Sequence, residues 1–222
     1  MGKIILEAKN VYKSYKNGEK KLDVLSGFNL ELREKEIITI TGQSGCGKST
    51  TLNILGTLDS PDIGNIIIEN KQVAELNDKQ LSTLRNKSIG FVFQFHYLLP
   101  EFSALENVLI PTWIKGNLSS GDYAENLFSD LGLAGKLHSF PNQLSGGERA
   151  RVALIRGIIN KPRILFADEP TGNLDEENAS NLIKLLIKIN KKYNQAIVIT
   201  THNPNVANIG NKKFKLEKGN LK

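Results

Sequence analysis

The fold of this chain is decided by the stretch IITITGQSGCGKST at residues 37–50. Its first part, Ile37–Thr41, is a short β-branched run that predicts a buried strand, and Thr51–Leu55 predicts a helix. Strand, glycine-rich loop and helix in this order are the setting of a phosphate-binding loop. We therefore expect a nucleoside triphosphate to be bound by Gly42, Gln43, Ser44, Gly45, Cys46, Gly47, Lys48, Ser49 and Thr50.

Each residue type in this loop has a chemical reason to be there. Glycines allow successive backbone N–H groups to point at one anion, and the following helix adds the positive end of its dipole. Lys48 supplies a full charge for the β- and γ-phosphates, and the Ser49 hydroxyl is expected to hold Mg²⁺. Cys46 is expected to fill space in the loop, so bound nucleotide should protect its thiol from alkylation.

Two adjacent acids end a second apolar strand. The run Ile164–Ala167 leads into Asp168 and Glu169, and carboxylates at the carboxyl end of a core strand lie where open α/β sheets bind ligands. Because side chains alternate faces along a strand, the two acids cannot simply duplicate one another. We predict that Asp168 joins Ser49 in holding Mg²⁺ and that Glu169 acts as the general base toward water.

Short apolar strands alternate with helices through most of the chain, which indicates an α/β fold with a mostly parallel core sheet. The buried strands expected in that sheet are Ile37–Thr41, Ile89–Phe93, Ile164–Ala167 and Ala196–Thr200. An N-terminal antiparallel β layer is predicted by Asn17-Gly18, a two-residue hairpin signal between Val11–Tyr15 and Leu22–Leu25. The interval Leu105–Leu137 is helical in character, with breaks expected at Pro111, Gly116 and Gly132, and predicts an inserted helical lobe.

Composition restricts the class of protein. The 222 residues suit one domain, and no apolar run reaches the roughly 18 residues of a membrane span. Early charges at Lys3 and Glu7 argue against a secretion signal, and the single cysteine fits a reducing compartment, so we expect a cytoplasmic protein. The net charge is +6, but the lysines are scattered, with short clusters at Lys188–Lys192 and Lys212–Lys218, so no nucleic-acid partner is expected.

The most specific string is Leu144-Ser145-Gly146-Gly147-Glu148, ahead of the amphipathic helix predicted at Glu148–Ile159. A serine hydroxyl and glycine amides at a helix start make a second anion site. The string resembles the signature of ABC ATPases. In that family the signature covers the γ-phosphate held by a second subunit, so the resemblance implies a homodimer, ATP and Mg²⁺ as cofactors, and poor hydrolysis by a lone monomer.

Further positions match the family pattern one by one. Tyr15 resembles the aromatic that stacks on adenine, although with Tyr12 nearby it could be an ordinary hairpin aromatic. Gln94 resembles the glutamine that senses Mg²⁺ and the attacking water, so it joins the expected metal and catalytic residues. Asp175 resembles the residue that crosses the dimer interface, and His202 the histidine that contacts the γ-phosphate.

The resemblance covers essentially the whole chain, so it implies a single ABC ATPase domain over residues 1–222. Its expected division is a RecA-like core at about 1–94 and 160–222, with a helical subdomain that carries the signature at about 95–159. This is the P-loop NTPase class of α/β fold.

Within the family, the segments Phe91–Pro100, Ala104–Val108 and Gly172–Asp175 are similar to the LolD and MacB group, and Phe95-His96 is most like its LolD members. The resemblance implies an ATPase peripheral to the cytoplasmic face of the inner membrane, bound to membrane subunits of the LolC and LolE kind and powering lipoprotein release. Ala150 and Leu154-Ile155 depart from the common pattern without touching phosphate chemistry. Three alternatives stay open: an FtsE-like regulator of cell-wall remodelling, a MacB-like exporter and a non-transport ABC protein.

Overall fold

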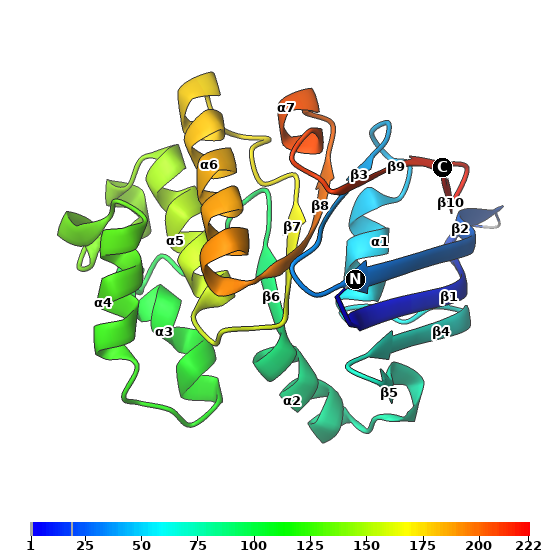
Figure 1. The fold of residues 1–222 in the computed structure, drawn as a ribbon, viewed down its shortest axis with the longest axis horizontal. Helices are drawn as coiled ribbons and strands as arrows, with labels where there is room; N and C mark the ends of the chain where they lie inside the picture. Colours follow the sequence, from blue (N-terminus) through cyan, green and yellow to red (C-terminus); the bar gives the residue numbers. More distant parts are fainter. Residues whose placement is uncertain (1, 19) are drawn as a thin grey trace.

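The computed structural model describes residues 2–18 and 20–222, which form two β-sheets and a set of helices (Figure 1). The larger sheet has the strand order β10-β9-β3-β8-β7-β6. Its strands are β3 (Ile37–Thr41), β6 (Ile89–Val92), β7 (Ile164–Asp168), β8 (Ala196–Thr201), β9 (Lys212–Glu217) and β10 (Asn220–Leu221).

The four buried strands predicted from the sequence are confirmed as neighbours in this sheet. The pairs β3–β8, β8–β7 and β7–β6 are all parallel, so these strands end at one common edge. They are rich in Ile and Val because both faces of the sheet are covered, and every residue of β8 is buried. The Gly-rich loop and the two acids therefore meet at the carboxyl edge of the sheet.

The strand β9 was not predicted, because its residues read as a basic cluster. It pairs with β3 in parallel, and β10 then pairs with β9 in antiparallel fashion. The half-buried Phe214 and the buried Leu216 alternate with exposed Lys213 and Lys215. A two-residue alternation was thus present in the sequence, but the lysines concealed it.

The smaller sheet confirms the antiparallel layer and has the order β2-β1-β4-β5. Its strands are β1 (Ile4–Asn17), β2 (Lys20–Arg33), β4 (Ile63–Ile68) and β5 (Lys71–Gln72). Asn17 pairs with Lys20 in the hairpin, so Asn17 belongs to the strand and not to the turn as predicted; residue 19 lies outside the described residues. Gly18 has φ 63°, a left-handed conformation that glycine adopts without strain.

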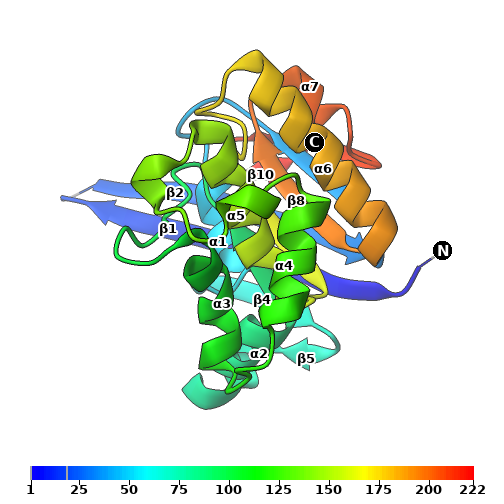
Figure 2. The same cartoon turned by 90° about the vertical axis from the view of Figure 1, so that its left-hand side faces the viewer.

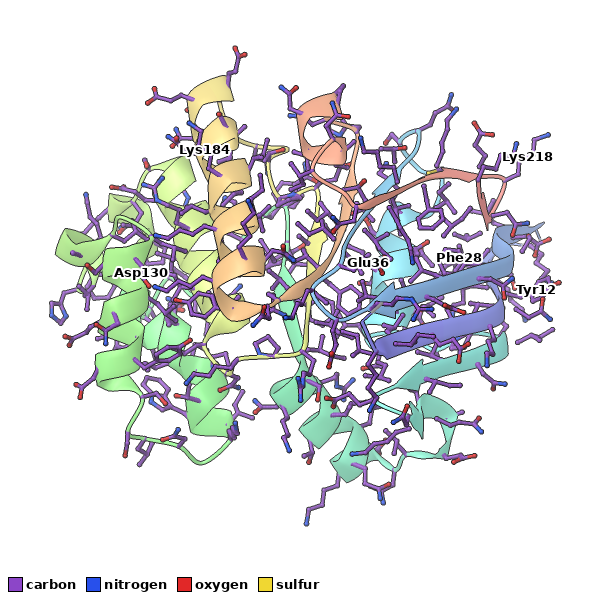
Figure 3. The ribbon with its side chains drawn as sticks, in the orientation of Figure 1. Tyr12, Phe28, Glu36, Asp130, Lys184 and Lys218 are labelled. Atoms are coloured by element: carbon purple, nitrogen blue, oxygen red, sulfur yellow. The ribbon has the colours of Figure 1, made fainter. Side chains whose placement is uncertain are left out.

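Helix α1 (Lys48–Leu55) lies between the two sheets and joins their cores. Leu52 and Leu55 belong to one buried cluster with Phe28 from the small sheet and Phe166 from β7. Phe28, labelled in Figure 3, is only 1% exposed. The loop that precedes α1 is therefore held at both of its ends by packed elements.

The remaining helices, apart from α2 (Asp78–Ser88), cover the other face of the large sheet and extend to one side of it, whereas Leu84 of α2 packs in the same cluster as α1 (Figures 1 and 2). Besides α2 they are α3 (Ala104–Ile114), α4 (Gly121–Asp130), α5 (Gly146–Ile158), α6 (Glu176–Tyr193) and α7 (Pro204–Ala207). Short 3-10 turns are present at Val73–Glu75, Ala134–Lys136 and Pro141–Gln143. In the described residues, 2–18 and 20–222, no helix combines the length and apolarity needed to span a bilayer.

The break expected at Pro111 is wrong, because Pro111 lies inside α3. A proline there removes the N–H that would bond the carbonyl of Asn107 one turn earlier. The helix tolerates this because Ser103 and Glu106 cap its start reciprocally. The Pro111 carbonyl also accepts hydrogen bonds from the side-chain amides of Asn86 at 2.9 Å and Asn160 at 3.1 Å.

Candidate functional site

The loop between β3 and α1 adopts a conformation that only glycine fits at two positions. Gly45 has φ 77° and Gly47 has φ 103°. A Cβ at Gly47 would also lie 2.5 Å from the Val24 side chain. Helix α1 begins at Lys48, and the Thr51 N–H already donates to the Gly47 carbonyl at 2.8 Å. The first amides of α1 thus remain free to bind an anion in front of the loop.

A cavity of about 700 Å³ opens over this loop. Its lining comes from the small sheet, from the start of α1 and from the loops at the carboxyl edge of the large sheet: Tyr15, Leu22, Val24, Gly42, Gln43, Ser44, Gly45, Gly47, Lys48, Ser49, Thr50, Gln94, Glu169 and His202. The cavity therefore collects residues that are far apart in the sequence, and it contains eight of the nine loop residues expected to bind nucleotide.

Cys46 is the loop residue that does not line this cavity. Its side chain instead lines a separate pocket with Gln43 and Leu216. Its sulfur lies against Gly42, because a Cβ built there would be 2.5 Å from Sγ. Cys46 fills space behind the loop, and its backbone N–H donates to the Gln43 carbonyl at 3.3 Å.

Lys48 is a buried cation aimed at the loop. It is 8% exposed, and its Nζ donates to the carbonyls of Gly42 at 3.0 Å and Gln43 at 3.1 Å. The same Nζ lies 3.5 Å from Oε1 of Glu169. A buried ammonium beside free helix amides gives this part of the cavity a strong preference for an anion such as a phosphate chain.

The two acids after β7 point in different directions. Asp168 Oδ1 accepts a hydrogen bond from Thr200 Oγ1 of the neighbouring strand β8 at 2.5 Å, and Asp168 does not line the cavity. Glu169 does line it. Glu169 has φ 43°, a strained conformation for a residue with a side chain, and it turns the carboxylate toward Lys48 and His202.

Gln94 lies directly beyond β6 and is paired with a residue of the segment Gly172–Asp175 to which the sequence assigned no role. The Asn173 side chain donates to the Gln94 carbonyl at 3.0 Å, and Gln94 Nε2 lies 3.5 Å from Asn173 Oδ1. A Cβ at Gly172 would approach Gln94 Nε2 to 2.8 Å. Residues 172 and 173 thus fix where the Gln94 side chain can go.

The oxygen donors near the cavity fit Mg²⁺ bound with a nucleotide. Ser49, Gln94 and Asp168 offer a hydroxyl, an amide carbonyl and a carboxylate, all hard donors. Within residues 2–18 and 20–222 no group of three or more His, Cys, Asp or Glu could hold a metal by itself. Mg²⁺ commonly takes one or two carboxylates and completes its shell with phosphates and water, and this donor set has that form.

Tyr15 forms one wall of the cavity, whereas Tyr12 does not. Its hydroxyl donates to Asp59 Oδ2 at 2.6 Å, and Lys13 Nζ lies 5.1 Å from the ring centroid. Burial by itself would raise the pKa of the Asp59 carboxyl, but hydrogen bonds from Lys13 and Tyr15 outweigh burial and lower that pKa. The ring is therefore held by a charged pair, and Asp59 is a supporting residue that sequence reasoning missed.

Leu22 and Val24 of β2 line the cavity near Tyr15 and were also missed. Their spacing of two residues places both on one face of the strand. Together with the Tyr15 ring they give this end of the cavity an apolar surface, in contrast to the cationic end at Lys48. Such a division suits a ligand with an aromatic base at one end and a phosphate chain at the other.

The five signature residues lie outside the cavity. Ser145 caps α5: its Oγ accepts from the Glu148 N–H at 3.2 Å, and its own N–H donates to the Glu148 carboxylate at 2.8 Å. A Cβ at Gly147 would meet the Asn178 side chain at 2.0 Å, so glycine is required there. The start of α5 is thus a second, separate helix N-terminus with the geometry of an anion site.

Asp175 is placed as the cap of α6. Its Oδ1 accepts from the Asn178 N–H at 2.8 Å and its Oδ2 from the Asn178 side-chain amide at 2.7 Å. Asn178 is the residue that lies against Gly147. Asp175 therefore supports the loop beside the signature, in addition to any contact with a second chain.

Comparison with known proteins agrees with this geometry. The family model described as "ABC transporter" matches residues 25–172. The lipoprotein-releasing system ATP-binding protein LolD of Cytophaga hutchinsonii is 48% identical over 217 residues, which cover 97% of this chain and 97% of the relative. The protein of the same name from Legionella pneumophila, strain Lens, is 45% identical, with 100% of this chain and 98% of the relative covered.

Among solved structures, the dimeric structure of MJ0796, described as a bacterial ABC transporter cassette, has a TM-score of 0.91 and 39% sequence identity. The match covers 98% of this chain and 97% of that one. The same cassette in a post-hydrolysis state with ADP and Pi has a TM-score of 0.89. The expected fold class is confirmed by these matches.

Proposed function

The chain belongs to the ABC transporter family, and from this premise we propose that it is the ATP-hydrolysing subunit of a lipoprotein-releasing transporter. The proposal includes a homodimer of this chain on the cytoplasmic face of the cell membrane. It also includes integral membrane subunits of the LolC and LolE kind, through which the chain is held at the membrane. Relatives named for lipoprotein release match this chain over nearly its whole length and theirs, which supports this choice within the family.

One observation carries the proposal: a single chain has two sites suited to phosphate, and they do not share a cavity. Lys48 and its loop line one cavity, and Ser145 at the start of α5 lies outside it. A nucleotide on the loop of one copy is completed by the Ser145 helix of a second copy. The relative whose solved structure is described as dimeric supports this arrangement.

The roles proposed for the site follow from its geometry. Tyr15, Leu22 and Val24 accept the base, and Lys48 with the loop amides binds the phosphates. Mg²⁺, when bound, supplies positive charge for the phosphates and would be held by Ser49, Asp168 and Gln94. Glu169 and His202 lie where they can orient water and contact the γ-phosphate.

The contact with the membrane subunits is proposed on the segment that follows Gln94. Phe95 is 66% exposed and Tyr97 62% exposed, and Leu99 is exposed as well. Three large apolar side chains within five residues form a surface suited to a helix of another protein. Phe95 also belongs to the part of the sequence that is most like the LolD group.

The partner test uses a Glu169→Gln variant, incubated with ATP and recovered from detergent-solubilised membranes. We expect stalled dimers that retain two integral membrane subunits, identified by mass spectrometry. A Lys48→Ala variant, which cannot retain the phosphates, is the matched control and should recover them far less. Recovery of ribosomes or DNA without membrane protein would exclude the transporter.

The cargo test uses vesicles that contain the recovered assembly and a lipid-anchored protein. We expect ATP to release the anchored protein with the wild-type chain and not with Glu169→Gln. Retention of the cargo by an assembly that hydrolyses ATP normally would favour the FtsE-like or MacB-like alternatives.

A further inference from the structure

Two consecutive residues just beyond Gln94 have strained backbones. His96 has φ 62° and Tyr97 has φ 47°, both in the left-handed region, and neither is glycine. Such a backbone conformation is unfavourable for a residue with a side chain and persists only where surrounding groups enforce it. The neighbouring hydrogen bonds are short-range: the His96 N–H donates to Phe93 at 3.0 Å, and the Tyr97 N–H donates to Phe95 at 2.7 Å.

Arg156 supplies the long-range contact that holds these two residues. Its Nη2 donates to the His96 carbonyl at 2.5 Å, and its Nη1 donates to the Tyr97 carbonyl at 2.6 Å. The planar guanidinium thus binds both strained peptides at once, a geometry that a lysine ammonium cannot reproduce. The partners are 60 and 59 residues away in the sequence, so the sequence alone gives no sign of this contact.

Arg156 also lies in a position to connect two functional segments. It is in the last turn of α5, the helix that begins after Ser145. Arg156 is eleven positions after Ser145, or roughly 16 Å along the helix axis. The segment 95–97 follows Gln94 directly, and the two hydrogen bonds from Arg156 join it to α5. Arg156 also lines a groove of about 230 Å³ with Phe93 and Pro111.

We propose that Arg156 is a positioning residue for ATP hydrolysis, whose guanidinium fixes the segment after Gln94 to the helix that Ser145 begins. This inference rests on the proposed function, in which Gln94 faces the nucleotide of its own copy and Ser145 that of the other. A rigid link makes the two residues change position together. Closure of the dimer on one nucleotide is thereby transmitted to the Gln94 loop at the other.

The test compares Arg156→Lys with the wild-type dimer. We expect kcat for ATP to fall roughly ten- to hundredfold, because small misplacement of reacting groups has costs of that order. We expect KM to change less than about twofold, because Arg156 does not touch the nucleotide cavity. Hydrogen exchange at the amides of residues 95–97 should become faster, while exchange in β7 and β8 stays as in the wild type.

Arg163→Lys is the matched control, since that arginine side chain is 63% exposed and lies outside both segments. It should hydrolyse ATP as the wild type does. Unchanged kcat in Arg156→Lys would overturn the proposal. A lower kcat without faster exchange at 95–97, or with equally faster exchange throughout the sheet, would overturn it too, because the effect would then not act through this segment.

A second measurement needs no change at Arg156. In the Glu169→Gln chain, ATP should slow exchange at residues 95–97 and at the start of α5 together. A response of only one of these segments contradicts the link. These readouts use purified dimers without membrane subunits, so they remain decisive even if the membrane partners prove to be of another kind.

Discussion

The carboxylate of Glu169 is held by His202 through two contacts. Oε2 of Glu169 accepts a hydrogen bond from the backbone N–H of His202 at 3.1 Å and lies 2.9 Å from its Nδ1. The other oxygen, Oε1, lies 3.5 Å from Lys48 Nζ. The end of β7, the end of β8 and the start of α1 thus meet at one acid.

The Glu169→Gln variant is expected to separate binding from hydrolysis. The amide keeps the shape of the side chain but cannot accept a proton from water, so kcat should fall by at least about a hundredfold. ATP should bind with an affinity close to that of the wild type, because Lys48 and the loop amides are unchanged. Phosphate release and binding of a fluorescent ATP analogue measure the two quantities.

The control for this change is Glu177→Gln, an exposed acid in the first turn of α6. It removes the same charge at a site without contact to the cavity and should leave kcat unchanged. Hydrolysis by Glu169→Gln at the wild-type rate would contradict the role given to Glu169.

The parts of the site that the sequence revealed are those made by contiguous residues. Strand, loop and helix at residues 37–55 follow from local pattern alone, and so do the strand and acids at 164–169. The supporting residues escaped prediction because their contacts span long sequence distances: Tyr15 and Asp59 are 44 apart, and Gln94 and Asn173 are 79 apart. No periodicity encodes such pairs.

Long-range contacts also explain where the fold predicted from the sequence was wrong. Pro111 predicts a break because its local effect on a helix is unfavourable. The hydrogen bonds that its carbonyl accepts from the side-chain amides of Asn86 and Asn160 are visible only in three dimensions. Strand β4 at Ile63–Ile68 was not predicted either, although it contains three consecutive isoleucines. Its second residue, Gly64, has φ 98°, and a Cβ there would lie 2.4 Å from the Asn10 carbonyl oxygen of β1.

Ser145→Arg is expected to abolish hydrolysis by preventing dimer closure. An arginine side chain at the start of α5 would occupy the space of the γ-phosphate and repel Lys48 of the other copy. The variant should still bind ATP through its own loop, because Ser145 does not line that cavity. Light scattering of the ATP-bound protein and phosphate release measure the loss of dimer and of activity.

Loss of the helix cap is a separate effect of this change, and Ser103→Ala controls for it. Ser103 caps α3 in the same reciprocal way, through Glu106. Removing such a cap costs about 1 kcal/mol of stability. Ser103→Ala should therefore lower the free energy of unfolding while it keeps dimerisation and hydrolysis. A Ser145→Arg chain that hydrolyses ATP normally as a monomer would contradict the proposal that two copies form each nucleotide site.

Tyr15→Ala is expected to weaken ATP binding by roughly tenfold, since base–aromatic stacking contributes about 1–3 kcal/mol. Tyr15→Phe keeps the ring and loses only the bond to Asp59, so its affinity should lie close to that of the wild type. Tyr12→Ala is the matched control on the same strand, because Tyr12 does not line the cavity. Equal affinities of Tyr15→Ala and Tyr12→Ala, measured by titration calorimetry, would mean that Tyr15 is an ordinary hairpin aromatic.

His96 is expected to make stability depend on pH. It is 7% exposed, and its Nδ1 has no hydrogen-bond partner within the described residues. Burial lowers the pKa of His96 below its ordinary value of 6.5, and the guanidinium groups of Arg149 and Arg156 lower it further. The folded chain therefore keeps this imidazole neutral at a pH where the unfolded chain already protonates it.

The direction of this pH dependence follows from the number of protons that the folded and unfolded states bind at His96. As the pH falls below 6.5, the unfolded state binds more protons at His96 than the folded state does, so the free energy of unfolding decreases. For one proton the slope is at most about 1.4 kcal/mol per pH unit. His96→Asn, which tolerates the left-handed backbone, should flatten this part of the curve, whereas His138→Asn at an exposed site should not. Denaturant unfolding across this pH range measures the slopes, and parallel curves for the wild type and His96→Asn would show that His96 is not the group responsible.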